Sequence, residues 1–158
     1  MDALAELTAQ VRRLVDRQEI TDLIHGYCFH FDNNEPQWIG ALFTDDVELD
    51  YGPDRPAIHG RGEAEQRLAR GLEQVFAATS HNVSNVQLTF DGEDRCTGVT
   101  YLYAWHRYHD GAPDGHLWAR YHHRFVRTAQ GWRIAWLQLR VLGTVDFHSP
   151  KVYPVERR

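Results

Sequence analysis

The chain has 158 residues, of which 42% are hydrophobic and 25% are charged, so it is neither a disordered nor a membrane-embedded sequence. The formal net charge is −5 and no run of lysine or arginine occurs, which argues against a nucleic-acid partner. No apolar run approaches the roughly 18 residues of a membrane span, and the charged N-terminus does not resemble a signal peptide. We therefore expect a cytoplasmic protein with a single domain over residues 1–158 and no membrane contact.

The first part of the sequence has the three- and four-residue spacing of apolar side chains that is typical of helices. The spacing predicts one long amphipathic helix over residues 4–31, with a candidate break near 16–18. Asn33-Asn34 ends this helix, and Glu35-Pro36 opens a short second helix through residue 43.

A turn, a short strand and a third helix follow. Residues 44–46 are typical of a turn, and alternation of apolar and polar residues over 47–51 predicts a strand. After a polar loop, the apolar residues of a third helix keep helical spacing: Leu68, Leu72, Val75 and Phe76. We expect this helix to end in the Ala-Ala-Thr-Ser segment before His81.

From His81 onward the pattern predicts long strands at 82–90, 96–109, 116–127 and 131–142. Short polar turns join them, so neighbouring strands should be antiparallel. The tail from about residue 143 has no clear periodicity. Helices followed by a long antiparallel sheet predict an α+β fold with the helices on one face, and a strongly twisted sheet of this kind leaves a conical cavity.

Asp32 and His81 are the first candidates for a functional site. Asp32 lies four residues after Cys28, on the same side of the first helix, where a buried carboxylate needs a partner. An equal alternative is that Asp32 turns toward solvent at the helix end. His81, taken alone, could equally be a core histidine.

Ten histidines also raise the question of a metal site. His106 and His109 are three residues apart on a strand and point to opposite faces, and adjacent His122 and His123 diverge in the same way. No HExxH or paired CxxC motif occurs, so we expect neither a metal nor an organic cofactor. A His-His-carboxylate site built from distant segments stays open. The two cysteines, Cys28 and Cys96, lie in apolar stretches and fit a reducing compartment.

Several segments resemble the SnoaL-like branch of the NTF2-like superfamily. They are Gln18-Glu19-Ile20, Leu42-Phe43-Thr44-Asp45-Asp46, Asp50-Tyr51-Gly52, Phe125-Val126-Arg127 and Gly131-Trp132-Arg133-Ile134. The resemblance covers about residues 8–142. It implies an NTF2-like (cystatin-like) α+β cone, in which a curved, mainly antiparallel sheet wraps around three N-terminal helices and holds a ligand pocket at its open end.

The pocket positions are most similar to those of the scytalone dehydratase family and partly to those of the hexachlorocyclohexane dehydrochlorinase family. Both families pair an aspartate at the end of the first helix with a histidine at the start of a strand. The resemblance therefore implies that Asp32 and His81 form a catalytic dyad. It adds His106 on the next strand and Tyr51 at the end of the early strand.

Two positions depart from the dehydratase pattern. Phe31 stands where that family has a tyrosine, and Tyr121 stands where it has an asparagine. The dyad is thus retained while the group that polarises the carbonyl is rebuilt, with Tyr27 or Tyr121 as the alternatives. We do not expect scytalone itself to be the substrate.

The predicted function is that of a cofactor-independent, dehydratase-like lyase. His81 would remove a proton alpha to a carbonyl, with Asp32 orienting its ring. Tyr51 would bond the developing oxyanion and His106 would assist the leaving group. Two alternatives stay open on the same pocket: an isomerase or cyclase of polyketide or steroid type, and a non-catalytic protein that binds small molecules.

The expected partner is a small hydrophobic, cyclic compound. The predicted pocket lining is Tyr27, Phe31, Leu102, Ala104, Leu117, Ala119, Tyr121 and Leu137. An apolar outer face of the sheet would also favour a homodimer or homotrimer. That face carries Val99, Tyr101, Tyr103, Trp105 and Trp118.

Overall fold

A computed structural model describes residues 3–156 of the chain. Its helices are α1 (Ala3–Asp32), α2 (Pro36–Gly40) and α3 (Arg61–Gln74). Its strands are β1 (Phe43–Asp50), β2 (Ile58–His59), β3 (Phe76–Asp91), β4 (Arg95–Tyr108), β5 (Gly115–Thr128) and β6 (Gly131–Val145). They form a six-stranded sheet in the order β2-β1-β6-β5-β4-β3. All neighbouring strands in this sheet are antiparallel except β1 and β6, which are parallel.

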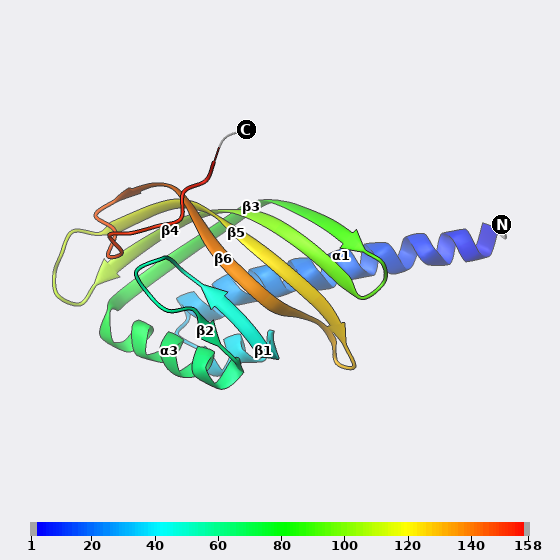
Figure 1. The fold of residues 1–158 in the computed structure, drawn as a ribbon, viewed down its shortest axis with the longest axis horizontal. Coiled ribbons are helices and arrows are strands. Elements are labelled where there is room, and N and C mark those ends of the chain that lie inside the picture. The colour runs from blue at the N-terminus through cyan, green and yellow to red at the C-terminus, as the bar shows by residue number, and fades with distance from the viewer. Residues whose placement is uncertain (1–2, 157–158) are drawn as a thin grey trace.

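The long strands curve over α1, and the first turns of this helix project beyond the sheet (Figure 1). Every second residue of β4 from Cys96 to Tyr108 is buried, which fixes the inner face of the sheet. This is the α+β cone expected from the sequence. No helix within residues 3–156 is long and apolar enough to cross a membrane.

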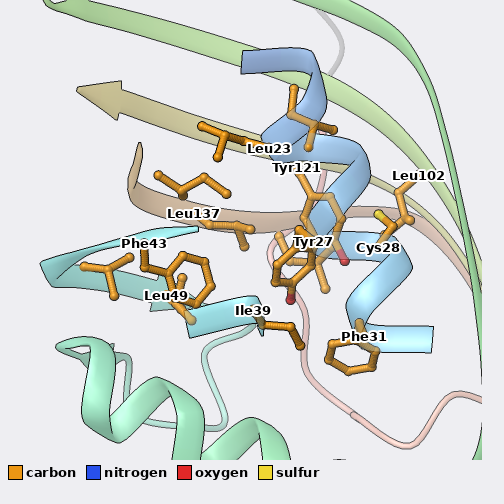
Figure 2. Close-up of a cluster of buried hydrophobic side chains, with 14 of the residues drawn as sticks. Leu23, Tyr27, Cys28, Phe31, Ile39, Phe43, Leu49, Leu102, Tyr121 and Leu137 are labelled. Atoms are coloured by element: carbon orange, nitrogen blue, oxygen red, sulfur yellow. The ribbon is translucent and has the colours of Figure 1, made fainter. Parts of the chain in front are cut away.

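The core lies between α1 and the inner face of the sheet. Figure 2 shows Leu23, Tyr27 and Phe31 on the helix among side chains of the sheet such as Tyr121 and Leu137. Burial of each large side chain of this kind contributes about 1.5–3 kcal/mol to the free energy of folding. The packing therefore holds α1 along the sheet and fixes where its C-terminal end lies.

The expected break in the first helix is wrong, because α1 runs unbroken through Asp16. The Asp16 carboxylate is buried and accepts hydrogen bonds from Arg127 Nη2 at 2.6 Å and Trp132 Nε1 at 3.1 Å. The polar residue that suggested a break is therefore an anchor between α1 and the β5–β6 hairpin.

Four other features of the secondary structure differ from the prediction. The second helix ends at Gly40, and residues 44–46 belong to β1 rather than to a turn, since Phe43 pairs with Ile134 of β6. Ile58–His59 forms the unexpected strand β2 beside β1. The third helix ends at Gln74, and the Ala-Ala-Thr-Ser segment lies in β3, where it pairs with β4. Pairing with a long neighbouring strand outweighs the helical propensity of alanine there.

Candidate active site

Asp32 is the last residue of α1, and the sequence that follows explains why the helix ends there. Asn34 adopts the left-handed conformation with φ of 56°, which asparagine tolerates better than most residues. The Glu35 N–H donates to the His30 carbonyl at 2.9 Å, and the Asn34 N–H donates to the Phe31 carbonyl at 3.1 Å. This Schellman arrangement terminates the helix and leaves the Asp32 side chain facing β3.

The Asp32 carboxylate accepts three hydrogen bonds from β3. Its Oδ1 lies 2.7 Å from His81 Nδ1 and 2.8 Å from Thr79 Oγ1, and its Oδ2 accepts from the His81 backbone N–H at 2.8 Å. The His81 side chain is 5% exposed, whereas that of Asp32 is 26% exposed. The carboxylate therefore lies behind the imidazole, toward the surface, and the imidazole faces the interior.

The protonation of the pair follows from these contacts. Burial raises the pKa of Asp32, but the hydrogen bonds from His81 and Thr79 and the His81 charge outweigh it and hold this pKa below its usual value. An ionised carboxylate only accepts hydrogen bonds, so Nδ1 of His81 carries the proton toward Asp32. The other ring nitrogen, Nε2, is then the free basic atom.

His81 lines a cavity of about 140 Å³, similar in volume to an engineered protein cavity that binds benzene. The wall of the cavity combines aromatic, aliphatic and polar side chains from α1, α3, the five strands β2 to β6, the β1–β2 loop and the C-terminal tail. Its lining residues are Tyr27, Phe31, Tyr51, Arg55, Pro56, Ile58, Arg67, Leu68, Gly71, Phe76, His81, His106, Leu117, Tyr121, Leu139, Phe147, His148 and Ser149.

His106 lies beside His81 in this wall. The two ring centroids are 5.5 Å apart and the rings are nearly perpendicular. Burial lowers the pKa of His106 to about 3, with further contributions from the charges of His81 and His148. Its Nδ1 is buried and has no hydrogen-bond partner among the described residues. His106 is therefore a neutral imidazole with an unpaired polar atom.

Tyrosine hydroxyls form a second polar feature of the cavity. Tyr27 and Tyr51 share a hydrogen bond of 2.7 Å between their hydroxyl oxygens. The edge of the Tyr121 ring packs on Tyr27, with centroids 5.8 Å apart. Burial raises the pKa of all three phenols above the ordinary tyrosine value. They are protonated at neutral pH and can act as hydrogen-bond donors but not as bases.

The structure brings together some of the residues chosen from the sequence and separates others. His81, His106, Tyr51, Tyr27, Phe31, Leu117 and Tyr121 line the cavity. Leu102, Ala104, Ala119 and Leu137 are buried in the core without lining it.

Sequence reasoning missed the lining residues contributed by loops, helix α3 and the tail. The polar or aromatic ones are Arg55, Arg67, Phe147, His148 and Ser149. Phe76, which was expected in the third helix, lines the cavity from β3. The available signal was that Arg67 lies three residues after buried Ala64 on α3, a spacing that puts both side chains on one side of the helix. Arg55 and His148 lie outside any periodic pattern and gave no such signal.

Metal binding has no support from the side-chain geometry. Within residues 3–156, no group of three histidine, cysteine, aspartate or glutamate side chains has an arrangement that could hold a metal ion. The cavity offers tyrosine, histidine and arginine groups instead, which suit hydrogen bonding to an organic molecule.

Comparison with known proteins identifies the family of the chain. A sequence profile of the SnoaL-like domain matches residues 12–138. A candidate scytalone dehydratase from Novosphingobium aromaticivorans, known from its crystal structure, has 30% sequence identity to this chain. The two structures match with a TM-score of 0.88 over 94% of this chain and 99% of that chain. No curated protein matches the sequence.

Two more distant structures share the fold. The hexachlorocyclohexane dehydrochlorinase type 3 of Novosphingobium barchaimii is 18% identical, with a TM-score of 0.80 over 92% of this chain and 99% of that chain. An NTF2-like protein with a cystatin-like fold from N. aromaticivorans is 24% identical, with a TM-score of 0.76 over 90% and 92% of the two chains. The chain belongs to the SnoaL-like domain family of the NTF2-like superfamily.

Proposed function

We propose that the protein is a cofactor-independent lyase of the dehydratase type, acting on a small hydrophobic, cyclic carbonyl compound. The observation that carries the proposal is the 2.7 Å contact between His81 Nδ1 and Asp32 Oδ1, with the His81 ring in the cavity wall. The 30% identical scytalone dehydratase candidate supports the same reaction class.

In the first step, His81 Nε2 removes a proton from the carbon next to the carbonyl. The Asp32 carboxylate holds Nδ1–H and stabilises the imidazolium that forms. The electron pair of the broken C–H bond moves into the substrate and gives an enolate. General base catalysis of this kind contributes about 10²–10⁴-fold to a rate.

The enolate oxygen is stabilised by the tyrosine pair. Tyr27 and Tyr51 have linked hydroxyls, so one phenol proton remains available to the substrate while the other holds the pair together. Since burial keeps both phenols protonated, the donor is in place before the charge develops. The Tyr27–Tyr51 pair thus serves as the group that polarises the carbonyl, and Phe31 contributes only an apolar wall.

In the second step, the enolate collapses to the unsaturated ketone and the bond to the β-hydroxyl group breaks. The hydroxyl departs as water with the proton that His81 carries. His106 is neutral, so its part is a hydrogen bond to the departing oxygen rather than proton donation as an imidazolium.

The neutrality of His106 favours isomerisation as a second candidate. Because His106 is neutral, elimination depends on His81 alone to return its proton to the leaving oxygen, whereas isomerisation returns that proton to another carbon and needs no group at the leaving oxygen. Both reactions begin with the same proton transfer to His81. A protein that only binds small molecules would need neither step.

The test is turnover of single-ring β-hydroxy ketones, followed by ultraviolet absorbance of the conjugated product, with exchange of the alpha proton in D₂O followed by NMR. His81→Gln should lower both rates by about 10²–10⁴-fold. His122→Gln is the matched control, because His122 lies on the same sheet but outside the cavity.

The possible outcomes separate the candidates. Exchange without water loss supports the isomerase. Equal rates for the unaltered protein and the His81 variant, over a substrate panel that includes a turned-over compound, would contradict both enzymatic proposals.

A further inference from the structure

The charged lining of the cavity is of one sign. Within residues 3–156, the lining includes the guanidinium side chains of Arg55 and Arg67 and no aspartate or glutamate. His148 stands near Arg55, and burial together with the Arg55 charge lowers its pKa to about 4, so that it is neutral. A predominantly apolar cavity thus carries two guanidinium groups and no lining carboxylate.

Arg67 on α3 has unused donors. Its Nη1 donates both to the Pro56 carbonyl at 3.3 Å and to Glu63 Oε1 at 3.2 Å. Because both contacts use one nitrogen, the remaining guanidinium N–H groups have no acceptor among the described residues. The Arg67 charge also opposes the effect of burial on the pKa of Tyr51, which places the charge near the proposed oxyanion donor.

Arg55 in the loop before β2 has a neutral partner. Its Nη2 donates to Ser149 Oγ at 2.9 Å, and no ion pair joins it to a carboxylate within residues 3–156. The charge of Asp54 raises the pKa of His148, but this effect is smaller than the lowering by the Arg55 charge. The Arg55 guanidinium is therefore held by a hydroxyl group rather than by a carboxylate.

We propose that the cavity takes a single-ring compound bearing a carboxylate, which Arg55 and Arg67 bind while the ring lies against His81. A planar guanidinium suits a carboxylate because it can donate two parallel hydrogen bonds. The cavity volume of about 140 Å³ limits the apolar part of the ligand to about one six-membered ring. This inference rests on the proposed function and names the substrate class for that reaction.

Binding of two probes that differ only in charge tests the inference. 4-Fluorobenzoate and 4-fluorobenzamide are titrated against the protein by fluorine NMR. We expect the benzoate to bind at least about tenfold more tightly than the benzamide at low salt. Arg55→Gln and Arg67→Gln should each weaken benzoate binding by at least about threefold and leave benzamide binding nearly unchanged.

Arg70→Gln is the control, because Arg70 is exposed on α3 and does not line the cavity. Thermal unfolding of each variant verifies that it is folded. The inference is overturned if the benzoate shows no preference over the benzamide, including the case in which neither binds. It is also overturned if the arginine variants weaken both probes equally, since that result indicates a role in holding the loop and tail.

His81→Gln separates this inference from the proposed reaction. The variant should retain the preference for the benzoate while losing turnover. If the preference fails but turnover still requires His81, only the substrate class is wrong. If the preference holds but turnover does not require His81, the reaction is wrong and the anion site stands.

Discussion

Asp32 holds His81 twice, accepting from its backbone N–H at 2.8 Å with one oxygen and from its ring Nδ1 at 2.7 Å with the other. The same carboxylate therefore ties the end of α1 to β3 and selects the tautomer of the candidate base. A structural contact and the proposed catalytic contact share the same side chain, so a substitution at Asp32 should affect stability and rate together.

Asp32→Asn should disable the base. An asparagine that accepts from the backbone N–H turns its amide NH₂ toward Nδ1, which favours the tautomer with the proton on Nε2. We expect turnover to fall by about 10³–10⁴-fold. The free energy of unfolding should fall by about 1–3 kcal/mol, because a hydrogen-bonded buried charge is lost.

Nitrogen NMR of the His81 ring checks the tautomer directly. Thr79→Val provides the comparison, because it removes the third hydrogen bond to Asp32 and leaves both contacts to His81 in place. Its effect on turnover should be about tenfold or less, with an effect on stability of about 1 kcal/mol. A proton that stays on Nδ1 in the asparagine variant contradicts the proposed role of Asp32.

His106 should not contribute a limb to the pH–rate profile near neutrality. Since its pKa is lowered to about 3, it does not change charge between about pH 5 and 9. His106→Asn should lower kcat by about 10–100-fold through loss of a hydrogen bond to the leaving group, with the acid limb of kcat/KM unmoved. Disappearance of that limb in the variant contradicts a neutral His106.

Two buried histidines, His106 and His123, and the half-buried His148 should make the fold sensitive to acid. The pKa values of His106 and His123 are lowered to about 3 and that of His148 to about 4, in each case first by burial. Below about pH 6.5 these histidines take up protons in the unfolded chain but stay neutral in the folded protein. The free energy of unfolding should then fall by up to about 1.4 kcal/mol per pH unit for each histidine, until the folded values are reached. Asp32, with its lowered pKa, adds stability that is lost only below about pH 4 and does not contribute in this range.

His123→Phe isolates one of these histidines. His123 lies in the core, stacked on Phe125 with ring centroids 5.1 Å apart, and is outside the cavity. The free energy of unfolding, measured with urea between about pH 4.5 and 7.5, should depend less steeply on pH in this variant. The difference in slope is the contribution of one histidine, up to about 1.4 kcal/mol per pH unit. The exposed His25→Gln serves as the control for removal of a surface histidine. An unchanged slope for His123→Phe contradicts a neutral His123 in the folded protein.

Helical spacing stops at Asn33-Asn34 and so assigned Asp32 to the end of the first helix, where the structure has it. The pairing of Asp32 with His81 came from the family resemblance, since periodicity alone left both residues open. His81 lies inside β3 rather than at a strand start, because β3 already begins at Phe76. Alternation along the strands put Leu102 and Ala119 on the inner face of the sheet. It could not tell how far along the cone each lies, and both are in the core rather than at the cavity.

The arginine side of the cavity could not be predicted in this way. Arg55 and Ser149 are 94 residues apart and come from segments without periodicity, and their hydrogen bond depends on how the loop and the tail cross the sheet. Strand β2 is also hidden, because Ile58–His59 is too short for alternation to be visible. Such features are set by tertiary packing rather than by local sequence.

Substitution of Asp16 should lower the free energy of unfolding more than most substitutions outside the cavity. Asp16→Asn removes a buried charge that pairs with Arg127 and accepts from Trp132 Nε1. We expect a loss of about 3 kcal/mol in the free energy of unfolding, at the low end for buried pairs because Arg127 keeps partial contact with water. Urea unfolding measures this loss.

Asp91→Asn is the control. It breaks an exposed ion pair with Arg95 and should change the free energy of unfolding by less than about 0.5 kcal/mol. Equal losses for the two variants contradict the anchor.

The outer face of the sheet should pair with a second copy of the chain. Trp118 is 45% exposed on β5 and packs against Tyr103, with ring centroids 5.5 Å apart, while Val145 is exposed on the neighbouring strand. An apolar aromatic surface of this kind is stabilised when an identical surface covers it. Trp118→Lys should therefore lower the mass measured by light scattering after size-exclusion chromatography. Trp38→Lys is the matched control, since Trp38 is 56% exposed on α2 and away from the sheet. A monomeric mass for the unaltered protein at micromolar concentration contradicts the interface, and an equal shift in both variants indicates a nonspecific effect of removing tryptophan.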